Sequence, residues 1–77
     1  MEKKMDIISE IYLMTGGKNI ANLINEFETN YKYNIRLKYI DVYKDNDELI
    51  IIKVIDEITE CPFELKFNED LGELEFY

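Results

Sequence analysis

The side chains in this sequence with the clearest capacity for chemistry are carboxylates, and most of them lie in the second half of the chain. Residues 1–40 carry six Lys or Arg and five Asp or Glu, whereas residues 41–77 carry three Lys and twelve Asp or Glu. Such a concentration of one charge attracts a partner of the opposite charge over a distance, and salt weakens that attraction. The sequence therefore predicts an acidic surface, but this surface by itself identifies neither a partner nor a reaction.

The spacing of the acidic residues suggests what such a surface would imitate. Side chains two residues apart in a strand lie on one face, about 6.6 Å from each other, which is comparable to the spacing of phosphates along a nucleic acid. Glu73 and Glu75 have this spacing. The predicted partner-binding residues are the acidic residues of the last hairpin and of an earlier turn: Glu64, Glu69, Asp70, Glu73, Glu75, Asp45, Asp47 and Glu48. A solvated surface that only keeps the protein in solution is the alternative.

The composition argues against most catalytic and metal-binding chemistry. The chain has no His and one Cys, so a Ser–His or Cys–His nucleophile lacks its base, and zinc of the finger type lacks its ligands. We therefore expect neither an enzyme nor a cofactor or metal site. Cys61 is predicted to be a small buried or half-buried core residue.

Two segments match ligand-binding motifs only in part. Residues 15–18 read Thr-Gly-Gly-Lys, but they lack the first Gly and the spacing of a phosphate-binding loop and follow a helix rather than a strand. They are predicted to form a connector. The Asx-rich residues 45–48 could offer oxygen ligands to a cation, yet Leu49 and Ile50 follow where a calcium loop needs further ligands. Residues 44–47 are predicted to form a turn.

Aromatic and basic residues are interleaved between Tyr31 and Tyr39, as they are on surfaces that stack nucleic-acid bases. In a strand, however, Tyr33 and Tyr39 would face the core while Arg36 and Lys38 face solvent, so that rings and cations lie on opposite sides. The net charge of −8 also opposes contact with nucleic acid. Direct nucleic-acid binding is therefore not predicted.

Two helices are predicted to precede the strands. Apolar residues at helical spacing predict a short helix over residues 5–14, which the two glycines at 16 and 17 end. Asn19 is a suitable N-cap for a second helix, whose apolar side begins with Ile20, Leu23 and Ile24. This second helix has the most regular pattern in the chain.

The rest of the chain is predicted to form four strands. Residues 33–39 alternate with Tyr33, Ile35, Leu37 and Tyr39 inward, residues 49–55 are apolar on both faces as in a central strand, and a further strand starts at Pro62. We predict a single α+β domain, residues 1–77, of order ααββββ, with both helices on one face of a four-stranded antiparallel meander.

The register of the last hairpin follows from its chemistry. If residues 69–72 form the loop, Asn68 faces Glu73 and Lys66 faces Glu75, so one face is apolar and the other polar. A five-residue loop would mix the two faces. In this register Lys66 partly neutralises Glu75, and Glu64, Glu73 and the turn acids remain free.

The chain lacks the uninterrupted apolar stretch of a signal peptide or of a membrane span, which needs about 20 residues. Its one cysteine suits a reducing compartment. A cytoplasmic location is therefore expected.

The profile of a very small acidic α+β chain without catalytic residues resembles the virus-encoded inhibitors of bacterial defence, the anti-CRISPR and anti-restriction proteins. This resemblance implies a non-enzymatic inhibitor or decoy whose acidic C-terminal surface blocks a nucleic-acid-binding host protein, such as a CRISPR or restriction nuclease. Residues 63–77 are also similar to the terminal hairpin of the gas vesicle protein O family and of PepSY-type domains. The alternative is a structural or assembly module that acts through a sheet edge or an apolar helix face, for example as a homodimer.

Overall fold

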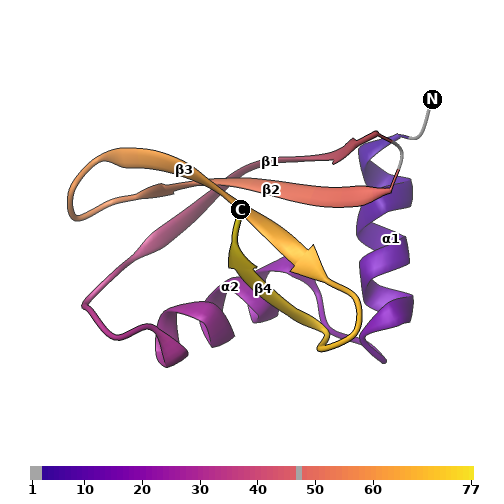
Figure 1. The fold of residues 1–77 in the computed structure, drawn as a ribbon, viewed down its shortest axis with the longest axis horizontal. Helices are drawn as coiled ribbons and strands as arrows, with labels where there is room; N and C mark the ends of the chain where they lie inside the picture. Colours follow the sequence, from indigo (N-terminus) through magenta and orange to yellow (C-terminus); the bar gives the residue numbers. More distant parts are fainter. Residues whose placement is uncertain (1–2, 47) are drawn as a thin grey trace.

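The computed structural model describes residues 3–46 and 48–77, and it has two helices followed by one sheet (Figure 1). The elements are α1 (Lys4–Met14), α2 (Ile20–Asn30), β1 (Leu37–Asp45), β2 (Leu49–Asp56), β3 (Cys61–Asn68) and β4 (Glu73–Phe76). The four strands lie in the order β1-β2-β3-β4, and each pair of neighbours is antiparallel. The predicted α+β class and the order ααββββ are confirmed.

The helix ends follow from local side-chain chemistry. The Thr15 hydroxyl donates to the carbonyl oxygen of Ile11 at 2.8 Å, and Gly16 (φ 71°) then takes a left-handed conformation, so α1 stops there. Asn19 caps α2, because its side chain accepts from the backbone N–H of Asn22 at 2.8 Å while the Asn22 side chain accepts from the Asn19 N–H at 3.1 Å.

The main core lies between the two helices and one face of the sheet. Its residues from the helices are Ile7, Ile11, Ile20, Leu23 and Ile24, and its residues from the strands are Leu37, Val42, Ile50, Ile52, Val54, Leu65, Phe67 and Leu74. In β2 every second side chain joins this core, as expected of a strand whose side chains alternate between faces.

The other face of the sheet, which we call the open face, carries one fully buried side chain. Ile51 is 0% exposed although it points away from the helices. Its cross-strand neighbours are Tyr43 on β1 and Lys66 on β3, which lie on the same face. The prediction that β2 is a central strand, apolar on both faces, is thus confirmed.

The predicted hairpin register is also confirmed. Asn68 pairs with Glu73, and Lys66 pairs with Glu75, so residues 69–72 form the loop. Gly72 has φ 67°, a conformation that glycine adopts without steric cost, and its N–H donates to the carbonyl oxygen of Asn68 at 2.8 Å.

The prediction for residues 33–39 is wrong in part. The strand begins only at Leu37, whose partner Asp56 is the last residue of β2, so the preceding residues have no strand beside them. Tyr33 is therefore 65% exposed rather than in the core. A bulge between Tyr39 and Asp41 distorts the alternation there, and Tyr39 is 39% exposed.

Two smaller predictions are also corrected. Cys61 is exposed, because it is the first residue of β3 and lies beside the β2–β3 turn at the end of the sheet. The first turn begins later than predicted, because Lys44 and Asp45 still belong to β1 and Asn46 has φ 53°. No helix in the described part of the chain is long and apolar enough to cross a membrane.

Candidate interaction surface

The meander brings acidic residues from two turns to one end of the sheet. Because neighbouring strands are antiparallel, β1 and β3 run in the same direction, and the turns that follow them lie at the same end, near α1 (Figure 1). We call this part of the surface the acidic end; its residues are Asp45, Glu48, Glu69, Asp70 and Glu73. Asp47, which was predicted to belong with them, lies outside the described residues.

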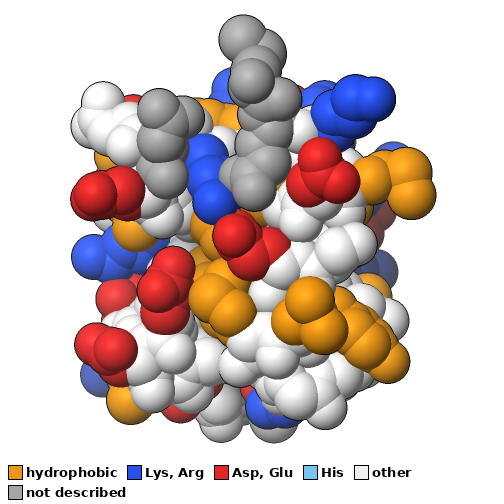
Figure 2. Space-filling view, turned by 90° about the vertical axis from the view of Figure 1, so that its right-hand side faces the viewer, with side chains coloured by type: hydrophobic (Ala, Val, Ile, Leu, Met, Phe, Trp, Pro, Cys, Tyr) orange, Lys and Arg blue, Asp and Glu red, His pale blue; other side chains and the backbone are white. Residues whose placement is uncertain are grey.

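The two turns share a groove. Glu48 from the first turn and Glu69 from the second line it, with Leu49 and Phe67 contributing apolar surface and Lys44 completing the lining. The amine of Lys44 lies 2.8 Å from Glu10 Oε2 on α1, so part of the positive charge in the groove is balanced by the helix. Figure 2 views the molecule from this side and shows Asp and Glu side chains among exposed hydrophobic ones.

The acidic side chains of the second turn are exposed on a loop that hydrogen bonds keep ordered. Glu69, Asp70 and Glu73 are exposed, and Leu71 between them is 64% exposed. The Leu71 N–H donates to the Asn68 side chain at 3.1 Å, which fixes the turn. The acidic end therefore offers carboxylates around an apolar side chain on an ordered loop.

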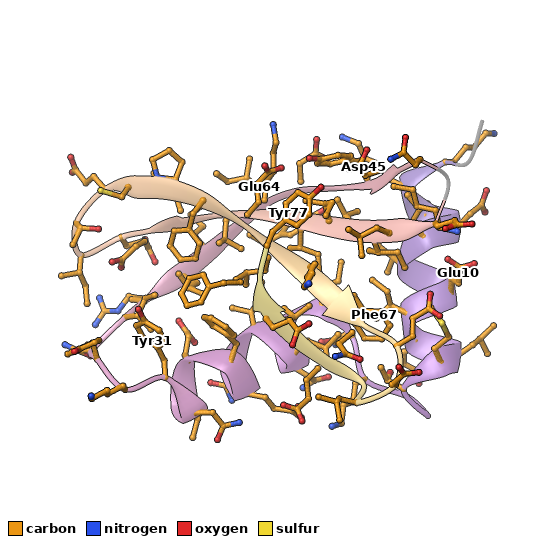
Figure 3. The ribbon with its side chains drawn as sticks, viewed as in Figure 1. Glu10, Tyr31, Asp45, Glu64, Phe67 and Tyr77 are labelled. Atoms are coloured by element: carbon orange, nitrogen blue, oxygen red, sulfur yellow. The ribbon has the colours of Figure 1, made fainter. Side chains whose placement is uncertain are left out.

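Two tyrosines bind carboxylates across the open face. The hydroxyl of Tyr43 donates to Glu64 Oε2, and the hydroxyl of Tyr77 donates to Asp45 Oδ2 at 2.8 Å (Figure 3). The hydrogen bond to Glu64, together with burial and the negative charges of Glu64 and Asp45, raises the pKa of Tyr43 to about 12. The hydrogen bond to Asp45 and its negative charge likewise raise the pKa of Tyr77.

The predicted partner-binding residues are therefore divided between two surfaces. Glu64, expected to be a free acid, accepts a hydrogen bond from Tyr43. Glu75 lies 3.7 Å from the amine of Lys66 and accepts from Asn68 Nδ2 at 3.4 Å. These two glutamates lie on the open face, where side chains of the same chain partly neutralise them. At the acidic end Asp45 is half-buried and accepts from Tyr77, whereas the other acids there are exposed: Glu48, Glu69, Asp70 and Glu73.

A further acid, Asp56, has a structural role. It is only 7% exposed and accepts from the N–H of Arg36 at 3.2 Å, the N–H of Ile58 at 3.1 Å and the Thr59 hydroxyl at 2.9 Å. Burial alone would raise the pKa of Asp56, but these donors outweigh it and the pKa is lowered. Asp56 thus closes the β2–β3 turn and fixes the approach to β1.

At the opposite end of the molecule, aromatic rings gather around Phe76. The centroid of this ring lies 5.1 Å from that of Phe27 and 5.4 Å from that of Tyr31, which Figure 3 places at the end of α2. Lys32 Nζ lies 5.7 Å from the centroid of the Tyr33 ring, so a cation and a ring lie together in this segment. The reason is that residues 31–36 are irregular and have no strand alternation.

Sequence reasoning missed Glu10, Lys44, Tyr43 and Tyr77 as partners of the acidic residues. If the first strand had been predicted to reach Asp45, its alternation would have placed Tyr43 on the face opposite to Val42 and Lys44. Nothing local links Glu10 to Lys44. Among the described residues, no group of three or more His, Cys, Asp or Glu is arranged to hold a metal ion.

Comparison of the chain with protein-family models, with curated proteins and with solved structures found no match.

Proposed function

We propose that this protein is a non-catalytic inhibitor or decoy that covers the basic nucleic-acid-binding surface of a host protein, such as a CRISPR or restriction nuclease. The acidic end makes the contact. The observation that supports this proposal is that Glu48 and Glu69, which are distant in the sequence, line one groove, while Asp70 and Glu73 are exposed beside it.

The arrangement suits recognition of a basic surface for two physical reasons. Exposed carboxylates at one end of a chain with a net charge of −8 steer a positively charged partner toward that end and increase the association rate. Leu71, exposed among them, provides apolar area that can be buried on contact. No covalent chemistry is needed for such blocking.

The test is competition with labelled duplex DNA for a panel of purified CRISPR effectors and restriction endonucleases. Glu48→Gln with Glu69→Gln should lower the association rate by about tenfold at low salt. The matched control is Glu57→Gln with Glu60→Gln, which changes the net charge equally on exposed residues of the β2–β3 turn, at the opposite end of the sheet. The control should compete as the wild type does. Equal losses in both variants, or no loss in either, would contradict the proposed contact.

The alternative function, a structural or assembly module that forms a homodimer, has one observation in its favour. On α1, Met5 is 77% exposed and Leu13 is 79% exposed, which are high values for large apolar side chains. This alternative predicts that the molecular mass measured by light scattering increases with protein concentration. The mass should be lower for Leu13→Ser and unchanged by the carboxylate substitutions. A constant monomer mass would leave the inhibitor as the supported function.

A further inference from the structure

The sheet has two edges, and they differ in how well they could accept another strand. At the β1 edge, the bulge between Tyr39 and Asp41 interrupts the regular backbone, and Asp41 Oδ1 is 2.5 Å from the Lys4 amine of α1. At the other edge, β4 pairs with β3 in continuous register along its whole length. The regular edge of the sheet is therefore β4.

The backbone of β4 has peptide groups directed away from β3. The N–H of Tyr77 donates to the carbonyl oxygen of Glu64 at 3.3 Å, so the backbone N–H and C=O groups of residue 77 point toward β3. Peptide groups alternate in direction along an antiparallel ladder. The backbone groups of Glu73 and Glu75 therefore also point toward β3, and those of Leu74 and Phe76 point toward the open edge. An incoming strand would bond to the N–H and C=O groups of these last two residues.

An apolar groove follows this edge on the side of the helices. Between α2 and β4 it is lined by Phe27, Asn30, Tyr31, Leu74, Glu75 and Phe76. A separate small pocket between the same two elements shares Phe27, Asn30 and Leu74 with it and is also lined by Leu23, Glu26 and Glu73. Phe76 is 48% exposed, although three other aromatic rings, Phe27, Tyr31 and Phe63, surround it. A strand added at the edge would place every second side chain in this groove.

The acidic residues of β4 discriminate between possible occupants. Two registers let a second copy pair antiparallel through most of β4 with its apolar residues on the same side, one centred on Leu74 and one on Glu75. A register centred on Phe76 would pair only the end of the strand. The first register sets Glu73 opposite Glu75, and the second sets Glu75 opposite its own copy. Like charges directly opposite each other destabilise a strand pair. The same two carboxylates would stabilise a strand with basic side chains on that face. Glu73 is exposed, and Glu75 is only partly neutralised, by a lysine amine 3.7 Å away.

We propose that the β4 edge docks an extended segment of a partner protein in which basic and aliphatic residues alternate. The segment adds a fifth strand: its backbone bonds to Leu74 and Phe76, its aliphatic side chains enter the groove beside Phe27 and Tyr31, and its basic side chains face Glu73 and Glu75. This docking site shares Glu73 with the acidic end, but it uses neither Glu48 nor Glu69 of the groove there.

The probe is the acetylated and amidated hexapeptide Lys-Val-Lys-Val-Lys-Val. With the wild-type protein it should slow amide hydrogen exchange at Leu74 and Phe76, followed by NMR, by about tenfold or more. The control peptide has the same side chains but a methyl group on every backbone nitrogen, so it retains the charge and cannot donate backbone hydrogen bonds to the edge. Its affinity should be lower by about tenfold or more, because several hydrogen bonds are lost.

Two protein variants complete the experiment. Glu73→Lys with Glu75→Lys, after its fold is verified by circular dichroism, should reverse the preference toward the peptide Glu-Val-Glu-Val-Glu-Val. Glu48→Gln with Glu69→Gln should leave the protection of Leu74 and Phe76 unchanged, which separates this site from the acidic end. The proposal is overturned if the methylated peptide binds equally well, if no peptide binds, if protection appears on β1 instead, or if the protein already dimerises through β4.

Discussion

At the scale of single residues, tyrosine hydroxyls and lysine amines decide which carboxylates a partner could reach. Glu64 binds Tyr43 and Asp45 binds Tyr77, while Glu75 lies near Lys66 and Asn68. The count of acidic residues in the sequence therefore overstates the negative charge that the open face presents. The exposed carboxylates of the turns, such as Glu48 and Asp70, are more accessible to a partner than those of Glu64 and Asp45.

The hydrogen bond between Tyr43 and Glu64 predicts a loss of stability at alkaline pH. Folding raises the pKa of Tyr43 from 10.0 to about 12, so the protonated hydroxyl stabilises the fold fully below pH 10.0 and loses that contribution as the pH rises toward 12. The melting temperature of the wild type should thus fall more steeply between these pH values than that of Tyr43→Phe.

The control for this prediction is Tyr33→Phe, on a ring that is 65% exposed. It should retain the wild-type pH dependence, since the bond to Glu64 is intact. Parallel curves for Tyr43→Phe and the wild type would show that the Tyr43 hydroxyl does not contribute to stability through its ionisation.

At the scale of elements, β2 is the strand on which both faces of the sheet depend. Ile50, Ile52 and Val54 join the helices, whereas Ile51 is buried on the open face beside Tyr43. The apolar run in the sequence predicted that β2 is a central strand with apolar residues on both faces. The covering of Ile51 was not predicted, because it is made by side chains of β1 and β3 that alternate with core residues in their own strands.

We expect Ile51→Ala to lower the free energy of unfolding by about 2–5 kcal/mol, the range for a large side chain removed from a closed core. Urea denaturation measures this value. Ile51→Val, expected to lower the free energy of unfolding by about 0.5–1.5 kcal/mol, serves if the alanine variant does not fold.

The comparison variant is Ile58→Ala, because Ile58 is 50% exposed in the β2–β3 turn. Its effect should stay within about 0.5 kcal/mol. If Ile51→Ala were equally mild, the open face would not be packed over β2.

At the scale of the whole molecule, the meander converts a charge difference between two halves of the sequence into a charge difference between places on the surface. The acids of the two turns meet at one end, and the lysine in their groove, Lys44, pairs with Glu10 of α1. Gathering like charges at one end of a small protein stores repulsion, which salt screens over about 10 Å at 0.1 M. A surface used for binding is thus expected to cost some stability.

This repulsion predicts that Glu48→Gln with Glu69→Gln raises the melting temperature at low salt, by roughly 2–4 °C for a domain of this size. The increase should shrink as salt is added. Calorimetry at two ionic strengths checks both statements, with Glu57→Gln and Glu60→Gln as the equally charged control. A lower melting temperature in the first variant would mean that these carboxylates stabilise the fold instead of repelling each other.

The sequence by itself determined the elements whose signals are local. The Asn19 cap, the apolar run of β2 and the Asn68–Glu73 register of the last hairpin were all legible, because each rests on neighbouring residues or on the alternation of one strand. The start of β1 was not legible, because it depends on where β2 ends. The sequence also could not show which of the predicted acidic residues are exposed and which are hydrogen-bonded within the chain.

Only the tertiary structure decided which acids stand together. Glu48 and Glu69 meet in one groove because two turns of a meander lie at the same end, and Glu64 is occupied because Tyr43 reaches it across β2. Both facts join residues about twenty positions apart, 48 with 69 and 43 with 64. Local periodicity predicts which face of an element a side chain occupies. The pairing of strands determines which residues that side chain contacts, and this pairing is fixed only when the whole sheet has formed.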